Sequence, residues 1–114
     1  MATAELAVAM PTVLLVLGLG LSALSAGVDQ IRCVDAARAT ARLAARGEAD
    51  HRAVSAGHRL APSGSTISLS TGPAEVSVTV TAPPAAGMRW LGLTLRPSAS
   101  GVAAREDALP EGRP

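Results

Sequence analysis

Residues 6–28 read LAVAMPTVLLVLGLGLSALSAGV and contain no charged side chain. A transmembrane helix needs about 20 apolar residues to cross the hydrocarbon core of a bilayer, and this run is long enough. The whole chain has 114 residues, too few to surround such a helix with protein and bury it. The run therefore predicts one membrane-spanning helix over about residues 6–28.

The residues that follow predict that the helix continues well beyond the membrane. Residues 29–46, DQIRCVDAARATARLAAR, are good helix formers, and Gly47 is a typical C-terminal stop. A rod over residues 3–46 would be about 65 Å long at 1.5 Å per residue. At 100° per residue it has a charged face (Arg32, Asp35, Arg38, Arg42, Arg46) and a small-residue face (Cys33, Ala36, Ala37, Thr40, Ala41, Ala44). The small-residue face is suited to close contact with another element.

The C-terminal half predicts a second helix and a small sheet. Residues 48–60 form a short amphipathic pattern with the apolar stripe Ala49, Ala53, Ala56 and Leu60, an i,i+4 pair of Glu48 and Arg52, and a stop at residues 62–64. Residues 66–82, TISLSTGPAEVSVTVTA, alternate apolar and hydroxyl side chains around Gly72-Pro73, which predicts a β-hairpin. A third strand is expected near residues 98–105, whereas residues 88–95 are ambiguous.

The predicted fold class is therefore α+β: a long N-terminal transmembrane helix, a second short helix and a small antiparallel sheet of about three strands. We expect residues 1–47 to form the N-terminal helix, residues 48–106 a small α+β domain, and residues 107–114 a loose tail rich in proline and glycine.

Composition and spacing argue against an enzyme. The chain has ten basic and nine acidic residues, which implies no polyanion partner, and Trp90 alone provides no stacking platform for nucleic acid. His51 and His58 are seven residues apart, not the three or four that two metal ligands on a helix require. Nucleophile-elbow, P-loop and dinucleotide patterns are missing. We expect no catalytic residue, cofactor, metal or small-molecule substrate. The basic residues are all arginine and alanine is abundant, which is typical of a high-GC bacterial genome.

Four small residues are candidates for helix packing. Gly18, Ser22 and Ala26 recur every four residues within the apolar run, and small residues at this spacing let two helices approach closely in lipid. Cys33 lies about one turn beyond the run, on the small-residue face. It has two interpretations: a small apolar packing residue, or a thiol that cross-links neighbouring subunits outside the cell.

Glu5 stands immediately before the apolar run, in TAELAVAMP (residues 3–11). One interpretation is an acid that stabilises a helix N-terminus through the helix dipole, by about 0.3–1 kcal/mol. The other follows from the cost of a carboxylate at the edge of hydrocarbon, which a cation alongside would reduce. The nearest available cation is the α-amino group of another copy of the chain. That pairing would align parallel helices with a small axial stagger.

The chain resembles TadE-like minor pilins of the tight-adherence (type IVc) pilus systems. The resemblance lies in TAELAVAMPTVLLVL (residues 3–17), the apolar run, QIRCVDAARATARLAAR (residues 30–46) and a short strand-rich tail. It implies that a prepilin peptidase cuts after a glycine and that glutamate is the fifth residue of the mature chain. Glu5 has that place if Met1 stands where the first mature residue would. It further implies that Glu5 neutralises a neighbouring subunit's N-terminus and aids transfer from the membrane into the pilus. The implied partners are the membrane, other pilin subunits, the pilus assembly platform and, where a leader exists, the peptidase.

The orientation in the membrane is open on the residues alone. A basic leader ending in glycine does not precede Met1 here, which leaves three cases: a leader upstream, a leader removed, or no processing. Arginines follow the apolar run, and the positive-inside rule would place that side in the cytoplasm. The resemblance implies the opposite, so we expect a single-pass protein of the cell membrane or pilus with its C-terminal part extracytoplasmic.

Two alternatives to a pilus subunit stay open. One is a secreted binding module whose signal peptide (residues 1–25) ends at Ala23-Leu24-Ser25. The other is a single-pass accessory subunit of another membrane complex.

Overall fold

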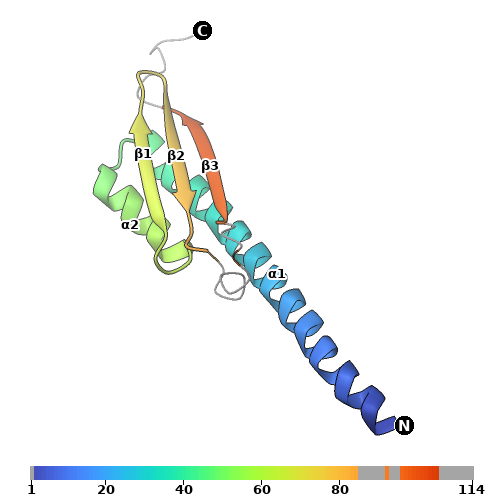
Figure 1. Cartoon of the computed structure of the whole chain (residues 1–114). Helices are drawn as coiled ribbons and strands as arrows, with labels where there is room; N and C mark the ends of the chain where they lie inside the picture. Colours follow the sequence, from blue (N-terminus) through green and yellow to red (C-terminus); the bar gives the residue numbers. More distant parts are fainter. Residues whose placement is uncertain (1, 85–91, 93–95, 106–114) are drawn as a thin grey trace.

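The computed structural model describes residues 2–84, 92 and 96–105. The element order is α1 (Ala2–Ala45), α2 (Asp50–Leu60), β1 (Thr66–Thr71), β2 (Glu75–Thr81) and β3 (Ser98–Ala104). The α+β prediction, with one long apolar helix, one short helix and three antiparallel strands, is confirmed. Figure 1 shows that the N-terminal half of α1 projects from a small domain, and the molecule measures 82 × 27 × 20 Å.

The first helix ends where the sequence predicts. Gly47 adopts a positive φ of 88°, a conformation that glycine reaches without steric cost. The Glu48 N–H donates to the Leu43 carbonyl over 3.1 Å, and the Gly47 N–H donates to the Ala44 carbonyl over 3.1 Å. These two bonds form a Schellman motif, which satisfies the last carbonyls of α1 and turns the chain back toward α2.

The small-residue face of α1 forms half of the protein core. Its buried residues are Cys33, Ala36, Ala37, Thr40, Ala41 and Ala45. The first five agree with the predicted face, whereas the predicted Ala44 is only partly buried and the buried Ala45 was not predicted. Four of them, Cys33, Ala36, Ala37 and Ala41, belong to one core cluster with the buried Val76, Val78 and Val80 of β2. Because the helix side chains are small, β3 approaches the helix backbone: a Cβ on Gly101 would lie 3.2 Å from the carbonyl oxygen of Ala37.

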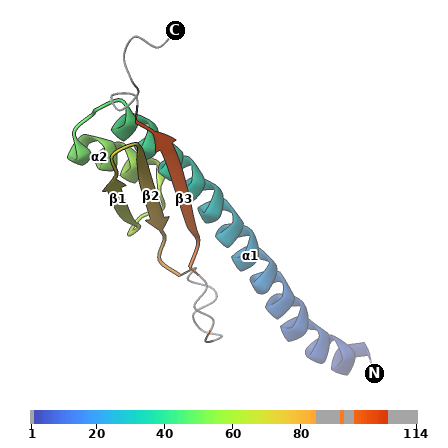
Figure 2. The same ribbon diagram turned by 90° about the horizontal axis from the view of Figure 1, so that it is seen from above.

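The sheet has the order β1-β2-β3 and is antiparallel throughout, with β2 in the centre. Figures 1 and 2 show α1 and α2 on the same face of the sheet, which gives a two-layer domain. The opposite face carries mainly hydroxyl side chains, for example Ser68, Thr79 and Ser100, which are exposed neighbours across the three strands. The ambiguous stretch 88–95, apart from Gly92, and the predicted tail lie outside the described residues.

The second helix differs from its prediction in start and face. It begins at Asp50 rather than Glu48, with Ala49 as a cap that makes no side-chain bond. Its buried residues are Ala53 and Gly57, whereas Leu60 is 44% exposed, so the predicted apolar stripe was only partly right. The physical reason is close helix packing: Gly57 presents no side chain to α1, which lets α2 lie directly against Thr40. The predicted pair of Glu48 and Arg52 is present at 3.9 Å on the surface.

Two polar side chains just beyond the apolar run tie α1 to the rest of the domain. Arg32 donates from Nε to the Leu60 carbonyl over 3.2 Å and from Nη2 to the Ala61 carbonyl over 3.1 Å. A cation is favourable there because the C-terminus of α2 has unsatisfied carbonyls and a negative dipole end. The Gln30 side-chain amide donates to the Ser98 carbonyl over 2.7 Å and accepts from the Ser98 N–H over 3.0 Å. Gln30 thus pairs with the edge of β3 as a neighbouring strand would.

Candidate assembly surface

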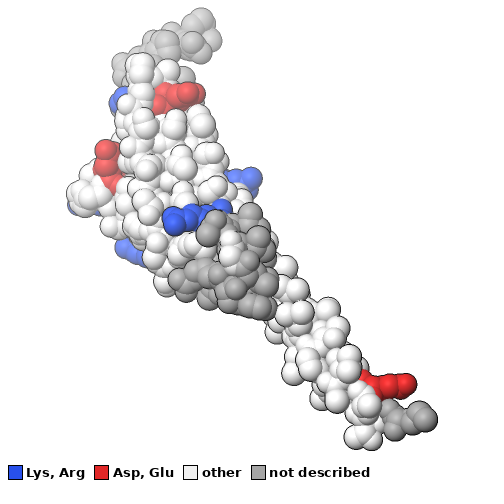
Figure 3. Space-filling model, viewed as in Figure 1, with Lys and Arg blue, Asp and Glu red and all other residues white. Residues whose placement is uncertain are grey.

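The N-terminal half of α1 is an uncovered apolar rod. Its most apolar window has a mean hydropathy of 2.2, and none of that window is buried in the protein. In Figure 3 the described part of the rod is almost entirely uncharged surface. Its exposed large side chains are Leu6, Val8, Met10, Val13, Leu14, Leu15, Val16, Leu17, Leu21, Leu24 and Val28. Soluble monomers rarely expose such a surface. By length and composition the helix suits a membrane span, and a signal sequence would meet the same criteria.

Glu5 lies in the first turn of α1 with its side chain exposed. Figure 3 shows the corresponding acidic patch near the N-terminal end of an otherwise uncharged rod. The surface beside it is a shallow depression lined by Ala4, Val8, Ala9, Thr12 and Val13. All these residues belong to one helix, so the depression is an open helix face and not an enclosed cavity. Glu5 forms no ion pair with any other described residue.

The predicted packing row faces the same side of α1 as the core. Gly18 is exposed, whereas Ser22 and Ala26 are half-buried. Ser22 and Thr40 are separated by about five helical turns, which places them on the same side of the rod. Glu5 lies about 20 Å along the axis from Gly18, so the structure does not bring the acid and the row together within one chain.

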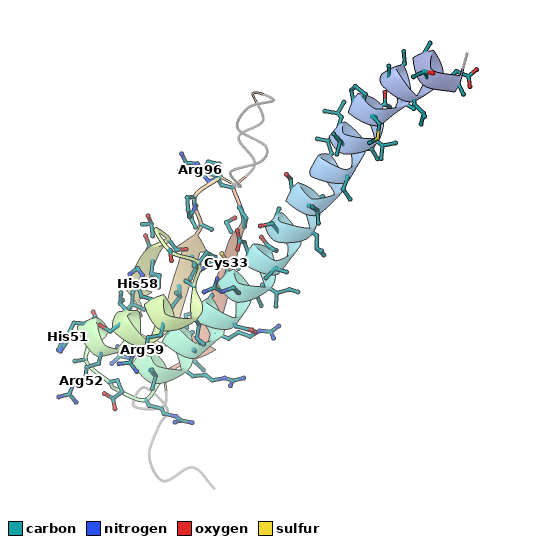
Figure 4. The ribbon with its side chains drawn as sticks, turned by 90° about the horizontal axis from the view of Figure 1, so that it is seen from below. Cys33, His51, Arg52, His58, Arg59 and Arg96 are labelled. Atoms are coloured by element: carbon teal, nitrogen blue, oxygen red, sulfur yellow. The ribbon has the colours of Figure 1, made fainter. Side chains whose placement is uncertain are left out.

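Cys33 lies in the core, between α1 and the sheet (Figure 4), and is fully buried. Its thiol donates to the Pro97 carbonyl at 3.8 Å. Burial, and after it the negative charge of Asp29, raises the pKa of the Cys33 thiol above its ordinary value. A side chain without exposed surface cannot meet a neighbouring subunit in this fold. Burial of Cys33 therefore supports its interpretation as a packing residue. It contradicts the interpretation of Cys33 as a cross-link between subunits.

We expect the Cys33 thiol to be at least 100-fold less reactive toward Ellman's reagent in the native full-length chain than in guanidinium chloride. The free energy of unfolding should be unaffected below the unfolded-state thiol pKa of about 8.5 and should fall as pH rises from there, because only the unfolded state ionises readily. A Cys33→Ala/Ser55→Cys variant is the control, because Ser55 is exposed on α2 and its replacement should react at once. Rapid labelling of native Cys33 would contradict the buried environment.

The two histidines do not form a site. Figure 4 shows His51 and His58 at separate places along α2, and both are exposed. Within the described ranges, His, Cys, Asp and Glu side chains are not grouped in threes that could hold a metal ion. That the chain has no metal, cofactor or catalytic residue stays a prediction.

Comparison with known proteins gives one similar curated protein. The chain is 41% identical over 78 residues to a protein of Mycobacterium tuberculosis named Apoptosis inhibitor Rv3655c. The match covers 68% of this chain and 62% of that protein, so the chain spans less than two thirds of its relative's length. Models of protein families do not match the chain, and neither do solved structures. The long apolar N-terminal helix fits a pilin-like protein.

Proposed function

We propose that this chain is a membrane-anchored structural subunit, a minor pilin or pseudopilin of a bacterial tight-adherence pilus. The observation that carries the proposal is that one continuous helix has two parts with different surroundings. Residues up to about 28 expose most of their apolar side chains, and residues 33–45 form half of the core of a small α+β domain. In this proposal the first part lies in the membrane or in the pilus, and the domain is extracytoplasmic.

Glu5 is the proposed contact between subunits. A carboxylate next to a long apolar run is costly in lipid unless a cation compensates it. The described residues of the same chain supply no partner to Glu5, and its side chain is exposed. In the proposed assembly the partner is the N-terminal ammonium of a neighbouring subunit. The exposed row face at Gly18 supplies a second point of close helix approach.

Helix continuity favours an anchor over a cleaved signal peptide. Ala23, Leu24 and Ser25 lie inside α1, which runs unbroken to Ala45. Gln30, within the same helix, already binds the sheet. The name of the Mycobacterium tuberculosis relative describes an inhibitor of apoptosis, and that is a property of that protein. The proposal for this chain rests on its own helix and charge pattern.

The proposal is tested by membrane retention and self-contact in a host that carries tight-adherence genes. The full chain should stay with membranes after carbonate extraction. In a Cys33→Ala background, Val8→Cys should give disulfide-linked dimers on mild oxidation, because Val8 is 73% exposed on the apolar rod. The matched control is Ser55→Cys on α2, which should stay monomeric.

Each alternative gives a different result in the same experiment. Extracellular protein beginning at Ala26 would establish the secreted module and overturn the proposal. A carbonate-resistant protein without Val8→Cys dimers, encoded away from genes for a secretion ATPase and a polytopic platform, would favour an accessory subunit of another membrane complex.

A further inference from the structure

A basic groove runs between α1 and the edge of the sheet. Its volume is about 240 Å³, and it is lined by Arg38, Ala41, Arg42, Gly101, Val102 and Ala103. One wall is the C-terminal part of α1 and the other is β3. Because β3 is the last strand in the order β1-β2-β3, its outer edge pairs with no other strand in the described part of the chain. The groove therefore combines two arginines with a strand edge.

The backbone of β3 presents unpaired groups at this edge. Ala82 donates its N–H to Pro97 over 2.8 Å, and Arg105 donates its N–H to Ala74 over 3.0 Å. In an antiparallel pair, alternate residues direct both backbone groups to the partner strand and the others direct them away. With the observed register, residues 99, 101 and 103 face β2, and residues 98, 100, 102 and 104 face outward.

Only the first of these outward positions has a protein partner among the described residues. Gln30 accepts from the Ser98 N–H and donates to its carbonyl. The outward backbone groups of Ser100, Val102 and Ala104 have no recorded protein partner in the described part of the chain. Gln30 thus closes one end of the edge, and about three alternate positions beyond it stay available to an added strand.

The charge beside the edge defines what kind of strand fits. Arg38 and Arg42 are exposed and lie one turn apart on α1. Within the described residues, no carboxylate lies within 4.0 Å of either guanidinium. Two like charges at this spacing repel each other, so a negatively charged partner would relieve the repulsion.

We propose that this groove binds an extended acidic segment of a partner protein by β-strand addition to β3. The spacings agree: Arg38 and Arg42 are about 6 Å apart along the helix axis. Alternate side chains on a strand are about 6.6–6.8 Å apart. Acidic residues at positions i and i+2 of the added strand would each meet one arginine, while its backbone pairs with Ser100 and Val102. Main-chain bonds then supply affinity and the two arginines supply specificity.

This inference is independent of the membrane and pilus assignment, because it uses only residues of the folded domain. A nucleic acid or an anionic bilayer would satisfy the arginines but would not pair with the backbone of β3. The experiment is therefore designed to separate charge attraction from strand pairing.

The probe is a fluorescent nine-residue peptide of alternating valine and glutamate, titrated into the full chain in detergent micelles and followed by anisotropy. We expect saturable binding that weakens at least tenfold in Arg38→Gln/Arg42→Gln. Val102→Pro should also weaken it at least tenfold. Residue 102 directs its N–H outward, so proline removes an edge donor and no bond to β2. Arg59→Gln, on exposed α2, is the matched control and should bind like the wild type.

Two further probes complete the test. A peptide with lysine in place of glutamate, and one with proline at alternate positions, should both bind at least tenfold more weakly. Circular dichroism must show that each protein variant keeps its fold. If Val102→Pro loses its fold, the proline-containing peptide and the double arginine variant still decide the question. Equal binding of the proline-containing peptide, or an unchanged affinity in the double arginine variant, would overturn the proposal.

Discussion

Glu5→Ala is expected to leave the protein in the membrane and to lower its incorporation into pili to background. The apolar run is untouched by the change, so carbonate-resistant membrane association should be normal. Incorporation should fail because a neighbour's N-terminal ammonium would enter the helix bundle without a counter-charge, and an unpaired charge in a low-dielectric site is strongly destabilising. The measurement is an immunoblot of sheared pili against membranes. Glu5→Gln should behave like Glu5→Ala, because it keeps the shape and removes only the charge.

The matched control is Asp29→Asn, the acid that follows the apolar run at its other end. It removes one negative charge from α1 but none from the N-terminal end, so incorporation should continue. Normal incorporation of the Glu5→Ala variant into pili would contradict the proposed pairing of Glu5 with a neighbouring N-terminus. A protein that is monomeric in detergent and in bilayers, and indifferent to loss of Glu5, would remove the basis of the assembly model.

Gly57→Ala is expected to lower the free energy of unfolding by about 1–3 kcal/mol, the usual cost of overpacking a core. Intrinsic propensity alone would favour alanine in a helix by up to about 1 kcal/mol, so the sign of the result is informative. The clash decides it here: a Cβ on Gly57 would overlap Oγ1 of Thr40 and lie 2.9 Å from Cδ1 of Ile67. The measurement is urea denaturation of the full chain in detergent, followed by circular dichroism.

A second substitution separates the clash from other causes. Thr40→Ala removes the hydroxyl that the new methyl group would meet, and Thr40 donates only to Ala36 within the same helix. The double variant Gly57→Ala/Thr40→Ala should recover most of the lost stability. Ser55→Ala, on the exposed side of α2, should change stability by less than about 0.5 kcal/mol. A Gly57→Ala protein more stable than the wild type would contradict the close helix contact.

The parts of the fold that sequence predicted are those with a local physical cause. Apolar length and helix propensity gave α1, the left-handed preference of glycine gave its end at Gly47, and alternation of valine with serine and threonine gave the hairpin. The 100° periodicity also assigned Cys33 and Thr40 correctly to the packing face. Each of these signals lies within a few residues of the element it specifies.

The parts that sequence missed depend on residues far apart in the chain. Gln30 meets Ser98, 68 residues away, and Arg32 meets Leu60, 28 residues away. A polar side chain just after an apolar run predicts only exposure to water, so neither partner could be inferred. Gly57 was missed for a related reason: a residue without a side chain adds nothing to an apolar stripe, although here it lies directly against Thr40 of α1. The proposed partner of Glu5 belongs to another molecule, so one chain cannot supply it.

The row of Gly18, Ser22 and Ala26 has a geometric consequence for any filament of this protein. The row and the domain share one azimuth of α1, and Gln30 already binds the sheet about one turn above Ala26. A second helix on the row would lie 8–10 Å from the first axis, and the sheet occupies that same space farther up. A parallel second helix that follows the row would therefore meet the sheet near Gln30. To use the row, a neighbouring helix has to cross α1 at an angle, so that it diverges from α1 before it reaches the sheet.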